Sequence, residues 1–499
     1  EIAQCLVGSE MCIRDSRWGF FPSLSGAWRI SEESFMESTR SWLDNLKIRL
    51  SWGKLGNSEI GNYEYQSAYG TSNYVFGNSL VSGLAITAYA NELLQWESTT
   101  TTNLGIDAAL LNNRLTVGID IYHKMTSGIL YRPAMEYVLG YHNNSDGVNV
   151  KAPRQNIAEV SNDGFELSLG WRDRIGKVEY SVSGNFSYNK NKVDKYNGEY
   201  TRTWVEDPNN TLTGGKWTDN IGKVSSGGNS PVVEGHMLNE YRYRSVYKGN
   251  GKYFNADGSV NPAGGPKGGM IRTEEDMNWV KAMMDAGYKF KPGNSIGKAN
   301  IYYGDYIYAD VNGDGVYGDS DDEEFQGRSK TPKYNFGFQA SAAWNGFDIS
   351  MVWAGAAGFD IYWGPTAGYN AAKTEWGNNI AQRIADDHYF YDPSNPDDPR
   401  TNINGKYPRM TYLDGNVQNN ASSNRWLYNG DYIKLKNLSL GYTLPQKWVT
   451  KVAMQNARIY VSAENLLTIT SFEGQDPESA TGMGYSPFRS IAIGANITF

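Results

Sequence analysis

The stretch from Lys333 to Gly355, KYNFGFQASAAWNGFDISMVWAG, decides the fold. From Tyr334 to Ala342, aromatic and alanine side chains at even positions alternate with asparagine, glycine, glutamine and serine at odd positions. A period of two predicts a strand with one apolar and one polar face. Asn345-Gly346 predicts a tight hairpin turn, after which the odd positions from Phe347 to Trp353 continue the apolar face.

Each of these two strands is about ten residues long, and a tilted strand needs about nine to eleven residues to cross a bilayer. Strands of a soluble sandwich are usually shorter, about five or six residues. In a membrane barrel the apolar face of the hairpin contacts lipid, and Gln339 and Ser341 face the lumen. The hairpin alone leaves both interpretations open, so the rest of the chain has to decide between them.

The composition indicates a β-rich protein. The chain has 499 residues, including 55 glycines and 35 tyrosines, and 13% of its residues are aromatic. Mean hydropathy is −0.56, and no run approaches the roughly 18 apolar residues of a membrane helix. A membrane role is therefore expected only as a barrel, whose alternating signal is weak. The net charge of −8 argues against nucleic acid as a partner.

The opening segment, residues 1–16, reads EIAQCLVGSEMCIRDS and has neither a strand period nor the layout of a signal peptide. We interpret it as non-native, adaptor-like sequence and exclude it from the fold prediction, which would leave the true N-terminus missing. It contains both cysteines, Cys5 and Cys12. For residues 17–499 we therefore expect no disulfide framework and no thiolate metal site.

The same alternation predicts eleven strands in all, at residues 21–30, 46–54, 101–111, 114–124, 165–171, 178–187, 333–344, 347–355, 432–442, 458–466 and 490–499. Their connections are alternately short and long, which places every long loop at one end of the sheet. Aromatic residues gather at both ends of the strands, as in the two girdles of an outer-membrane barrel. They are Trp28, Trp171, Trp344, Tyr442 and Phe499 at the short-turn end, and Trp52, Tyr188, Tyr334 and Trp353 at the other.

We therefore predict an all-β, antiparallel transmembrane β-barrel with long extracellular loops. The soluble alternative has to explain connections of about 75 and 140 residues, which compact domains rarely contain. Within the longest connection, Thr273 to Ala286 predicts a short capped helix.

The odd strand count predicts an open sheet. The first strand (21–30) and the last strand (490–499) run in the same direction, so closing the sheet would force a parallel pair between them, whereas the other neighbours are antiparallel. Both edges would then leave backbone groups unpaired, which is untenable in lipid. We expect this chain alone neither to insert stably nor to transport, and a strand upstream of residue 17 to pair with residues 21–30.

Eight segments distributed over the chain resemble the C-terminal half of a SusC/RagA-type TonB-dependent outer-membrane transporter. They are FFPSLSGAWRISEESF (20–35), LKIRLSWGKLGN (46–57), LQWESTTTTNLGIDAALLNNRLTVGIDIY (94–122), SNDGFELSLGW (161–171), YIYADVNGDGVYGDSDD (306–322), TPKYNFGFQASAAWNGFDISM (331–351), YIKLKNLSLGYTLP (432–445) and ARIYVSAENLLTIT (457–470). The resemblance implies a 22-stranded barrel with an N-terminal plug, to which residues 17–499 contribute about eleven C-terminal strands as an open half-barrel. The plug and the segment that contacts TonB would lie outside this chain.

The acidic loop DVNGDGVYGDSDD, residues 310–322, is the one candidate metal site. Asp310, Asn312 and Asp314 at alternate positions, followed by a glycine, match the first half of a Ca²⁺ loop, and the backbone carbonyl of Val316 would add a ligand. Asp321 stands at the twelfth position instead of the usual glutamate. The alternative is an Asx-turn loop that needs no metal.

Enzyme signals are poor, and we predict no catalytic residues. The letters of G-x-S-x-G occur at 293–297, but in a glycine-rich loop without the strand and helix of a nucleophile elbow. The four histidines lack metal-binding spacing. The C-terminal Phe499 resembles the terminal aromatic residue that the outer-membrane assembly machinery recognises.

Five loop tryptophans are candidates for stacking on substrate rings, with packing of the loops as the alternative: Trp204, Trp217, Trp363, Trp376 and Trp426. Three classes of function remain in view. The first is import of an oligomeric nutrient, a glycan or a peptide, with a SusD-like surface lipoprotein and the TonB–ExbB–ExbD complex. The others are a TonB-dependent siderophore or vitamin receptor without that lipoprotein, and a non-transporting surface adhesin or glycan-binding domain. An upstream plug and a neighbouring SusD-like gene would separate them. The expected location is the outer membrane.

Overall fold

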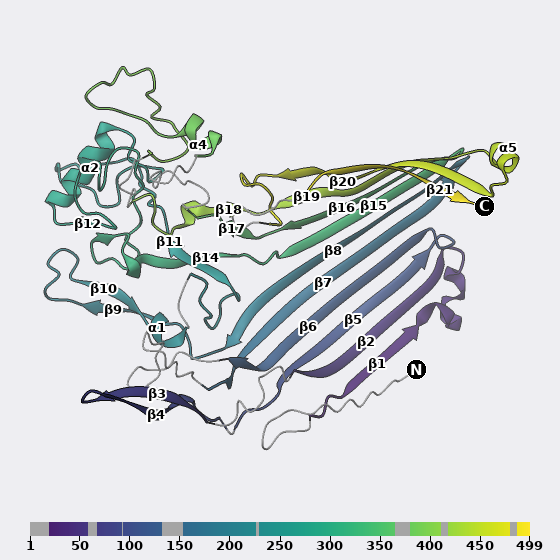
Figure 1. The fold of residues 1–499 in the computed structure, drawn as a ribbon, viewed down its shortest axis with the longest axis horizontal. Helices are drawn as coiled ribbons and strands as arrows, with labels where there is room; N and C mark the ends of the chain where they lie inside the picture. Colours follow the sequence, from purple (N-terminus) through teal and green to yellow (C-terminus); the bar gives the residue numbers. More distant parts are fainter. Residues whose placement is uncertain are drawn as a thin grey trace.

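A computed structural model describes residues 19–57, 67–91, 93–131, 153–225, 229–364, 380–410, 418–479 and 487–499. Its main feature is one antiparallel sheet of eleven strands, in the order β1-β2-β5-β6-β7-β8-β15-β16-β19-β20-β21 (Figure 1). The strands are β1 (Ser23–Arg29), β2 (Leu43–Asn57), β5 (Glu97–Leu110), β6 (Leu115–Tyr131), β7 (Gln155–Ile175), β8 (Val178–Lys195), β15 (Tyr334–Trp344), β16 (Phe347–Ala357), β19 (Tyr432–Thr443), β20 (Asn456–Thr470) and β21 (Ser490–Thr498). All eleven predicted strands are confirmed.

The strand register places the predicted apolar positions on one face. Residues paired across neighbouring strands share a face, and apolar residues pair with apolar residues from strand to strand. Examples are Leu50↔Leu104, Leu104↔Ile121, Ile121↔Phe165, Phe165↔Tyr188 and Tyr188↔Tyr334. Further along the sheet the series continues with Ala342↔Ile349, Ile349↔Leu440, Leu440↔Val461 and Val461↔Ile493.

The sheet is open, as the odd strand count predicts. β1 and β21 stand at its two edges and are not hydrogen-bonded to each other. The short connections lie together at one end, and the long connections lie at the other (Figure 1). The short end carries the helical turns η1 (Ile30–Glu32), η2 (Ser34–Thr39), α5 (Gln446–Val449) and η7 (Thr450–Val452).

Several strands extend further than the sequence predicts. β7 has 21 residues and begins at Gln155, whereas alternation predicts a strand only from residue 165. β8 has 18 residues and continues to Lys195. The added segments carry polar residues on both faces, as at Asn162-Asp163, so the apolar alternation that reveals a strand in lipid is absent although the hydrogen-bonded pairing continues.

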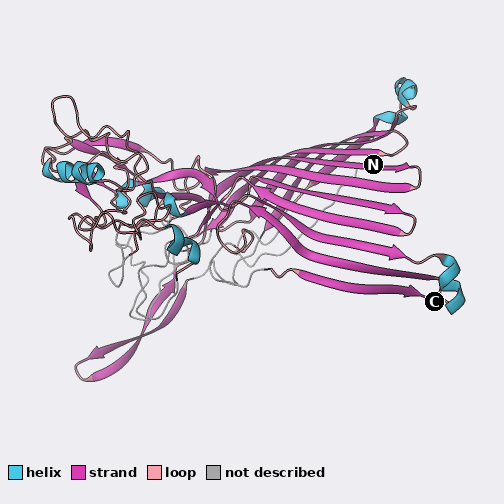
Figure 2. Ribbon diagram, turned by 90° about the horizontal axis from the view of Figure 1, so that it is seen from above, coloured by secondary structure: helices cyan, strands magenta, loops and turns pink. Residues whose placement is uncertain are grey.

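The connection between β2 and β5, one of the predicted long loops, contains a hairpin of its own. β3 (Ala68–Phe76) and β4 (Ser79–Ala88) form a hairpin that projects away from the sheet (Figure 2). Its strands expose apolar side chains on both faces, including Tyr74 and Leu84. The pattern therefore lacks the one-sided alternation by which the other strands were recognised.

The long connections after β8 and β16 fold into a lobe at one end of the sheet (Figure 2). They contain the strands β9 (Arg202–Glu206), β10 (Gly215–Asp219), β11 (Glu240–Arg244), β12 (Lys289–Phe290), β13 (Val316–Tyr317), β14 (Glu323–Ser329), β17 (Asp360–Tyr362) and β18 (Leu427–Asn429). The helical segments are α1 (Ile221–Val224), α2 (Glu274–Asp285), η4 (Ser320–Asp322), α4 (Gln382–Asp387) and η6 (Asn424–Trp426). The longest connection, in which the sequence predicts only the helix at Thr273 to Ala286, therefore also contains short paired strands.

The predicted helix is confirmed as α2, which organises the core of this lobe. Its N-terminus has a capping box between Thr273 and Asp276, which satisfies two orphan backbone donors. Trp279, Val280 and Met283 have no exposed surface and pack in the largest apolar cluster of the lobe. None of the helices in the described ranges has both the length and the apolarity needed to cross a bilayer.

Candidate functional site

The structure brings two of the predicted sites together in the lobe. The β9–β10 hairpin, which carries Trp204 and Trp217, packs on the acidic loop 310–322. The backbone N–H of Trp217 donates to the carbonyl of Asn312 over 2.7 Å, and Asn210 donates its side-chain amide to the carbonyl of Asp314 over 2.9 Å. Gly313 lies under both indoles, where an added Cβ would be 3.6 and 3.9 Å from the rings.

The two indoles form an exposed pair. Trp204 and Trp217 are 41% and 44% exposed, and their ring centroids are 5.7 Å apart at 72°. They are register partners in the β9–β10 hairpin, which fixes both rings on one face. Both are available for contact with a ligand.

The carboxylates of the acidic loop bind its own backbone. Asp310 accepts from the N–H groups of Gly313, Asp314 and Gly315 at 2.6, 3.2 and 2.9 Å. Gly313 and Gly315 have φ angles of 76° and 84°, which turn these N–H groups toward the carboxylate at no steric cost. The alternative interpretation, an Asx-turn loop, describes this geometry.

Asp322 closes the same loop from its other end. Its two carboxylate oxygens accept four backbone N–H groups, from residues 311, 312, 318 and 319, at 2.6–3.1 Å. Burial raises the pKa of Asp322 to about 7, against the opposing effect of the hydrogen bonds. Burial also raises the pKa of Asp310. Sequence analysis missed the role of Asp322 because its signal, an acidic residue at the end of an acidic run, is shared by Asp321.

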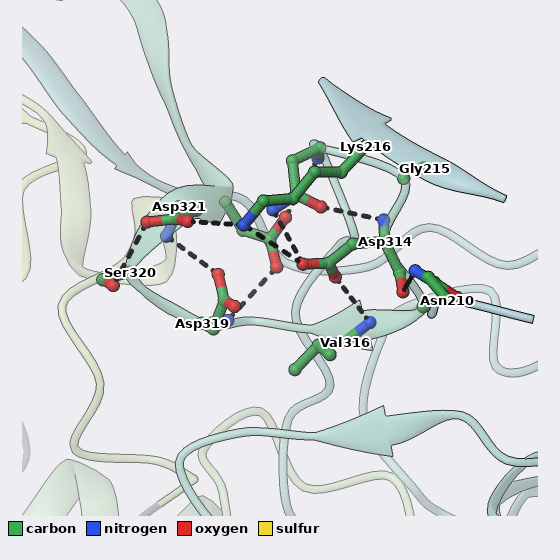
Figure 3. A network of polar contacts seen from close by, with 12 residues as sticks. Asn210, Gly215, Lys216, Asp314, Val316, Asp319, Ser320 and Asp321 are labelled. Carbon is green, nitrogen blue, oxygen red and sulfur yellow. Dashed lines mark hydrogen bonds and ion pairs between the residues drawn. The ribbon is translucent and has the colours of Figure 1, made fainter. Parts of the chain in front are cut away.

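A lysine from β10 supplies the cation nearest to the predicted metal ligands. The ammonium of Lys216 lies 3.2 Å from Asp321 and 3.8 Å from Asp314 (Figure 3). The hydrogen bond from Lys216 to Asp321, together with the negative charges of Asp321 and Asp314, raises the pKa of Lys216. Asp321 therefore pairs with Lys216 and not with the Asp310 end of the loop.

The residues present do not form a ready Ca²⁺ site. Both oxygens of Asp310 are occupied by backbone donors, and the described part of the chain contains no group of three or more histidine, cysteine, aspartate or glutamate side chains arranged for a metal. The side-chain oxygen of Asn312 accepts from the N–H of Asp314, and Val316 donates its own N–H to Asp314. Ca²⁺ binding by this loop stays a prediction.

The other predicted tryptophans lie elsewhere. Trp426 has no exposed surface and belongs to the core of the lobe, which corrects the prediction that its face stacks on substrate. Trp363 is half-buried against Tyr428 and Phe472, with Arg383 over its ring at 4.3 Å. Trp376 and residues 1–16 lie outside the described residues. Phe499 follows β21 and is exposed, and its role as an assembly signal stays a prediction.

A charged network on the polar face of the sheet was missed. Arg49 of β2 binds Asp107 of β5 at 2.7 Å and Asp120 of β6 at 3.0 Å, and Asn103 donates to Asp120 at 2.9 Å. Gly105 of β5 leaves the space that the guanidinium of Arg49 occupies, because a Cβ added at Gly105 would lie 2.6 Å from that guanidinium. The signal was present in the sequence as charges at polar-phase positions in the middle of three strands.

A sheet of this size, with an apolar face, an opposite charged face and all long connections at one end, defines an outer-membrane β-barrel protein. The model of the family "TonB dependent receptor-like, beta-barrel" matches residues 11–272, more than half of the chain. The chain belongs to this family, and the resemblance to SusC/RagA-type transporters and the outer-membrane location are confirmed.

Comparison with named proteins supports this assignment. TonB-dependent receptor P3 of Formosa agariphila is 27% identical over 99% of this chain and 43% of its own length. TonB-dependent receptor SusC of Bacteroides thetaiotaomicron is 26% identical over 99% of this chain and 41% of its own. The chain thus spans less than half the length of these relatives. The solved RagAB peptide transporter shares the fold, with a TM-score of 0.63 and 22% identity over 97% of this chain and 44% of that one.

Proposed function

We propose that this chain is the C-terminal part of the barrel of a TonB-dependent importer that moves an oligomeric nutrient, a glycan or a peptide, across the outer membrane. The single observation that carries the proposal is the two-faced sheet with a folded lobe at one end only. An apolar outer face suits lipid, a polar inner face suits a water-filled lumen or a plug, and the lobe suits capture of cargo at the cell surface.

The charges on the polar face support a lumen. Arg49, Asp107 and Asp120 lie mid-strand, where a charge is costly against lipid but tolerated inside a barrel. A second pair, Arg458 and Asp348, lies on the same face near the short-turn end. In the assembled protein these groups face water, cargo or a plug segment.

The exposed Trp204–Trp217 pair supports contact with cargo. Indole faces stack on sugar rings and on aromatic or proline side chains, so this feature fits both a glycan and a peptide. The partners in the proposal are a SusD-like surface lipoprotein, the TonB–ExbB–ExbD complex acting through a segment outside this chain, and the outer-membrane assembly machinery. We propose no enzymatic activity, and the relatives named above are called receptors.

Uptake in cells tests the proposal. The full-length protein is expressed in a host that lacks it, and import of fluorescent oligosaccharides and of fluorescent oligopeptides is measured with and without TonB and with and without the neighbouring SusD-like protein. The proposal expects uptake of one cargo class that needs both partners. Uptake of an iron chelate or a vitamin without the lipoprotein would favour the siderophore or vitamin receptor, and surface binding without uptake would favour the adhesin.

Two further proposals concern parts of the chain. We infer that residues 1–16 are non-native and that residues 17–499 are barrel sequence. Mass spectrometry of the protein isolated from its natural source tests the first statement. Detection of peptides that contain the sequence of residues 1–16 would refute it.

A further inference from the structure

A small cavity lies between two long connections of the lobe, away from the Trp204–Trp217 pair. It has a volume of about 200 Å³. One wall comes from Tyr302 and Tyr303, in the connection between β8 and β15, and the other from residues 389–391, in the connection between β16 and β19. A ligand in this cavity would contact both connections.

Close packing at Gly304 and a buried ion pair hold the two walls against each other. The ideal Cβ of residue 304 would lie 2.4 Å from the Tyr389 ring and 2.8 Å from the Cβ of Arg409. Only glycine therefore allows this approach, and Gly304 also adopts a φ of 84°. Arg409 binds Asp305 through two hydrogen bonds of 2.6 and 2.9 Å. The cavity is thus built on a rigid base.

Tyrosine rings dominate the lining. Tyr303 lies edge-to-face with Tyr391 at 5.3 Å and with Tyr302 at 5.3 Å. The three side chains are only partly buried, and within the described ranges their hydroxyl groups make no hydrogen bond. Burial, together with the nearby Glu274, raises the pKa of Tyr303 further above its ordinary value of 10. The lining offers aromatic faces edged with free hydroxyl groups.

His388 adds an acceptor. Its Nδ1 lies 2.9 Å from the carbonyl of Ala385 and 3.2 Å from that of Ile384. Because carbonyl oxygens only accept, Nδ1 carries the proton in the neutral ring and Nε2 is left as an acceptor.

The charges around the cavity balance one another. Lys298 and Asp392 both line it, and the guanidinium of Arg409 is already paired with the buried Asp305. The lining therefore carries no net charge that would select an ionic ligand. The lining offers aromatic surface with a few neutral hydrogen-bond donors and acceptors. The cavity volume is large enough for one six-membered ring and too small for a chain of linked residues.

We propose that this tyrosine pocket binds a single neutral sugar residue of a glycan at the cell surface. A pyranose presents C–H groups on its faces and hydroxyl groups around its edge. The faces match the tyrosine rings, and the edge matches the free hydroxyls and Nε2 of His388. The proposal rests on the proposed function and narrows its cargo from glycan or peptide to glycan.

Binding to the full-length protein in detergent tests the pocket. The probes are maltohexaose, cellohexaose, xylohexaose and a neutral tyrosine-containing hexapeptide, titrated by calorimetry. At least one hexasaccharide is expected to bind, and the double variant Tyr303→Ala/Tyr391→Ala is expected to weaken it at least tenfold. Tyr303→Phe/Tyr391→Phe keeps the rings and loses only the hydroxyls, so a loss of a few-fold is expected. The matched control, Tyr69→Ala/Tyr74→Ala on the exposed β3–β4 hairpin, is expected to bind like the unchanged protein.

Three results would overturn the inference: no saccharide binds, the pocket variants bind saccharide normally, or the variants lose the peptide and not the saccharide. These results are separable from failure of the proposed function. If uptake of oligosaccharides depends on TonB and the pocket variants take them up normally, the proposed sugar-binding role of the pocket is wrong and the proposed function stands. If the protein imports nothing but binds saccharide, and the pocket variants lose that binding, the proposed role of the pocket stands and the proposed import function is wrong.

Discussion

Replacing Phe338 by arginine tests the orientation of the whole sheet. Phe338 lies on the apolar face of β15, four residues after Tyr334 and six before Trp344. The ten steps between those two aromatic residues, at about 3.3 Å each, span about 33 Å of strand, or about 25 Å of bilayer at a tilt of about 40°. Phe338 therefore lies close to the midplane.

The expected cost has two parts. Arginine on the lipid face near the midplane costs about 2–4 kcal/mol. The ring of Phe338 also stacks on Trp353 at 5.6 Å and 12°, and losing such a pair removes about 0.5–1.5 kcal/mol more. The charge alone lowers the folding equilibrium constant by about 30- to 700-fold, since 1.4 kcal/mol is a factor of ten.

The assay is urea unfolding of the full-length protein in lipid vesicles, followed by the heat-modified gel shift of the folded barrel. Phe338→Leu measures the loss of the ring without a charge, and Gln339→Arg places the same charge one residue away on the opposite face. We expect Gln339→Arg to unfold near the wild-type midpoint and Phe338→Arg well below it. Equal midpoints for the two arginine variants would refute the assignment of the faces.

Three more predictions concern the long connections. Replacing Trp204 and Trp217 by alanine is expected to weaken cargo binding by about 1–3 kcal/mol in calorimetry, as two aromatic contacts are lost, whereas alanine at the exposed Trp448 of the short-turn end leaves affinity unchanged; equal losses would contradict a cargo contact. Burial favours protonation of Glu478, but hydrogen bonds from two lysines and a tyrosine hold its pKa at about 2, below the ordinary 4.5. Its contribution to stability is therefore complete above about pH 4.5 and is lost as pH falls from there through 2, which limited proteolysis of residues 471–479 at pH 6 and pH 3 detects, with Glu478→Gln as the variant that is equally sensitive at both. Titration with millimolar Ca²⁺ tests the acidic loop: heat that disappears in Asp310→Asn supports the site, and no heat from the unchanged protein removes it.

The sequence alone determined the sheet. A strand in a membrane barrel must alternate apolar and polar side chains, so stretches such as Lys333–Gly355 show a period of two. The alternating connection lengths and the aromatic strand ends could be recognised from the series of such stretches. The odd strand count then fixed an open sheet, because strand direction reverses at every connection. The helix at Thr273 was equally legible, since a capping box is a local signal.

The tertiary structure decided everything that depends on contacts between distant segments. Strand ends beyond the lipid lose their alternation, so the length of β7 appeared only with its partners. The lobe has a core of residues far apart in sequence, which is why Trp426 is buried while Trp204 and Trp217 are exposed. The acidic loop was legible as a motif, but only packing showed that Lys216 of β10 lies beside Asp321 and Asp314. Burial and the approach of a distant charge are properties of the folded chain, because no local pattern encodes which segment will lie next to which.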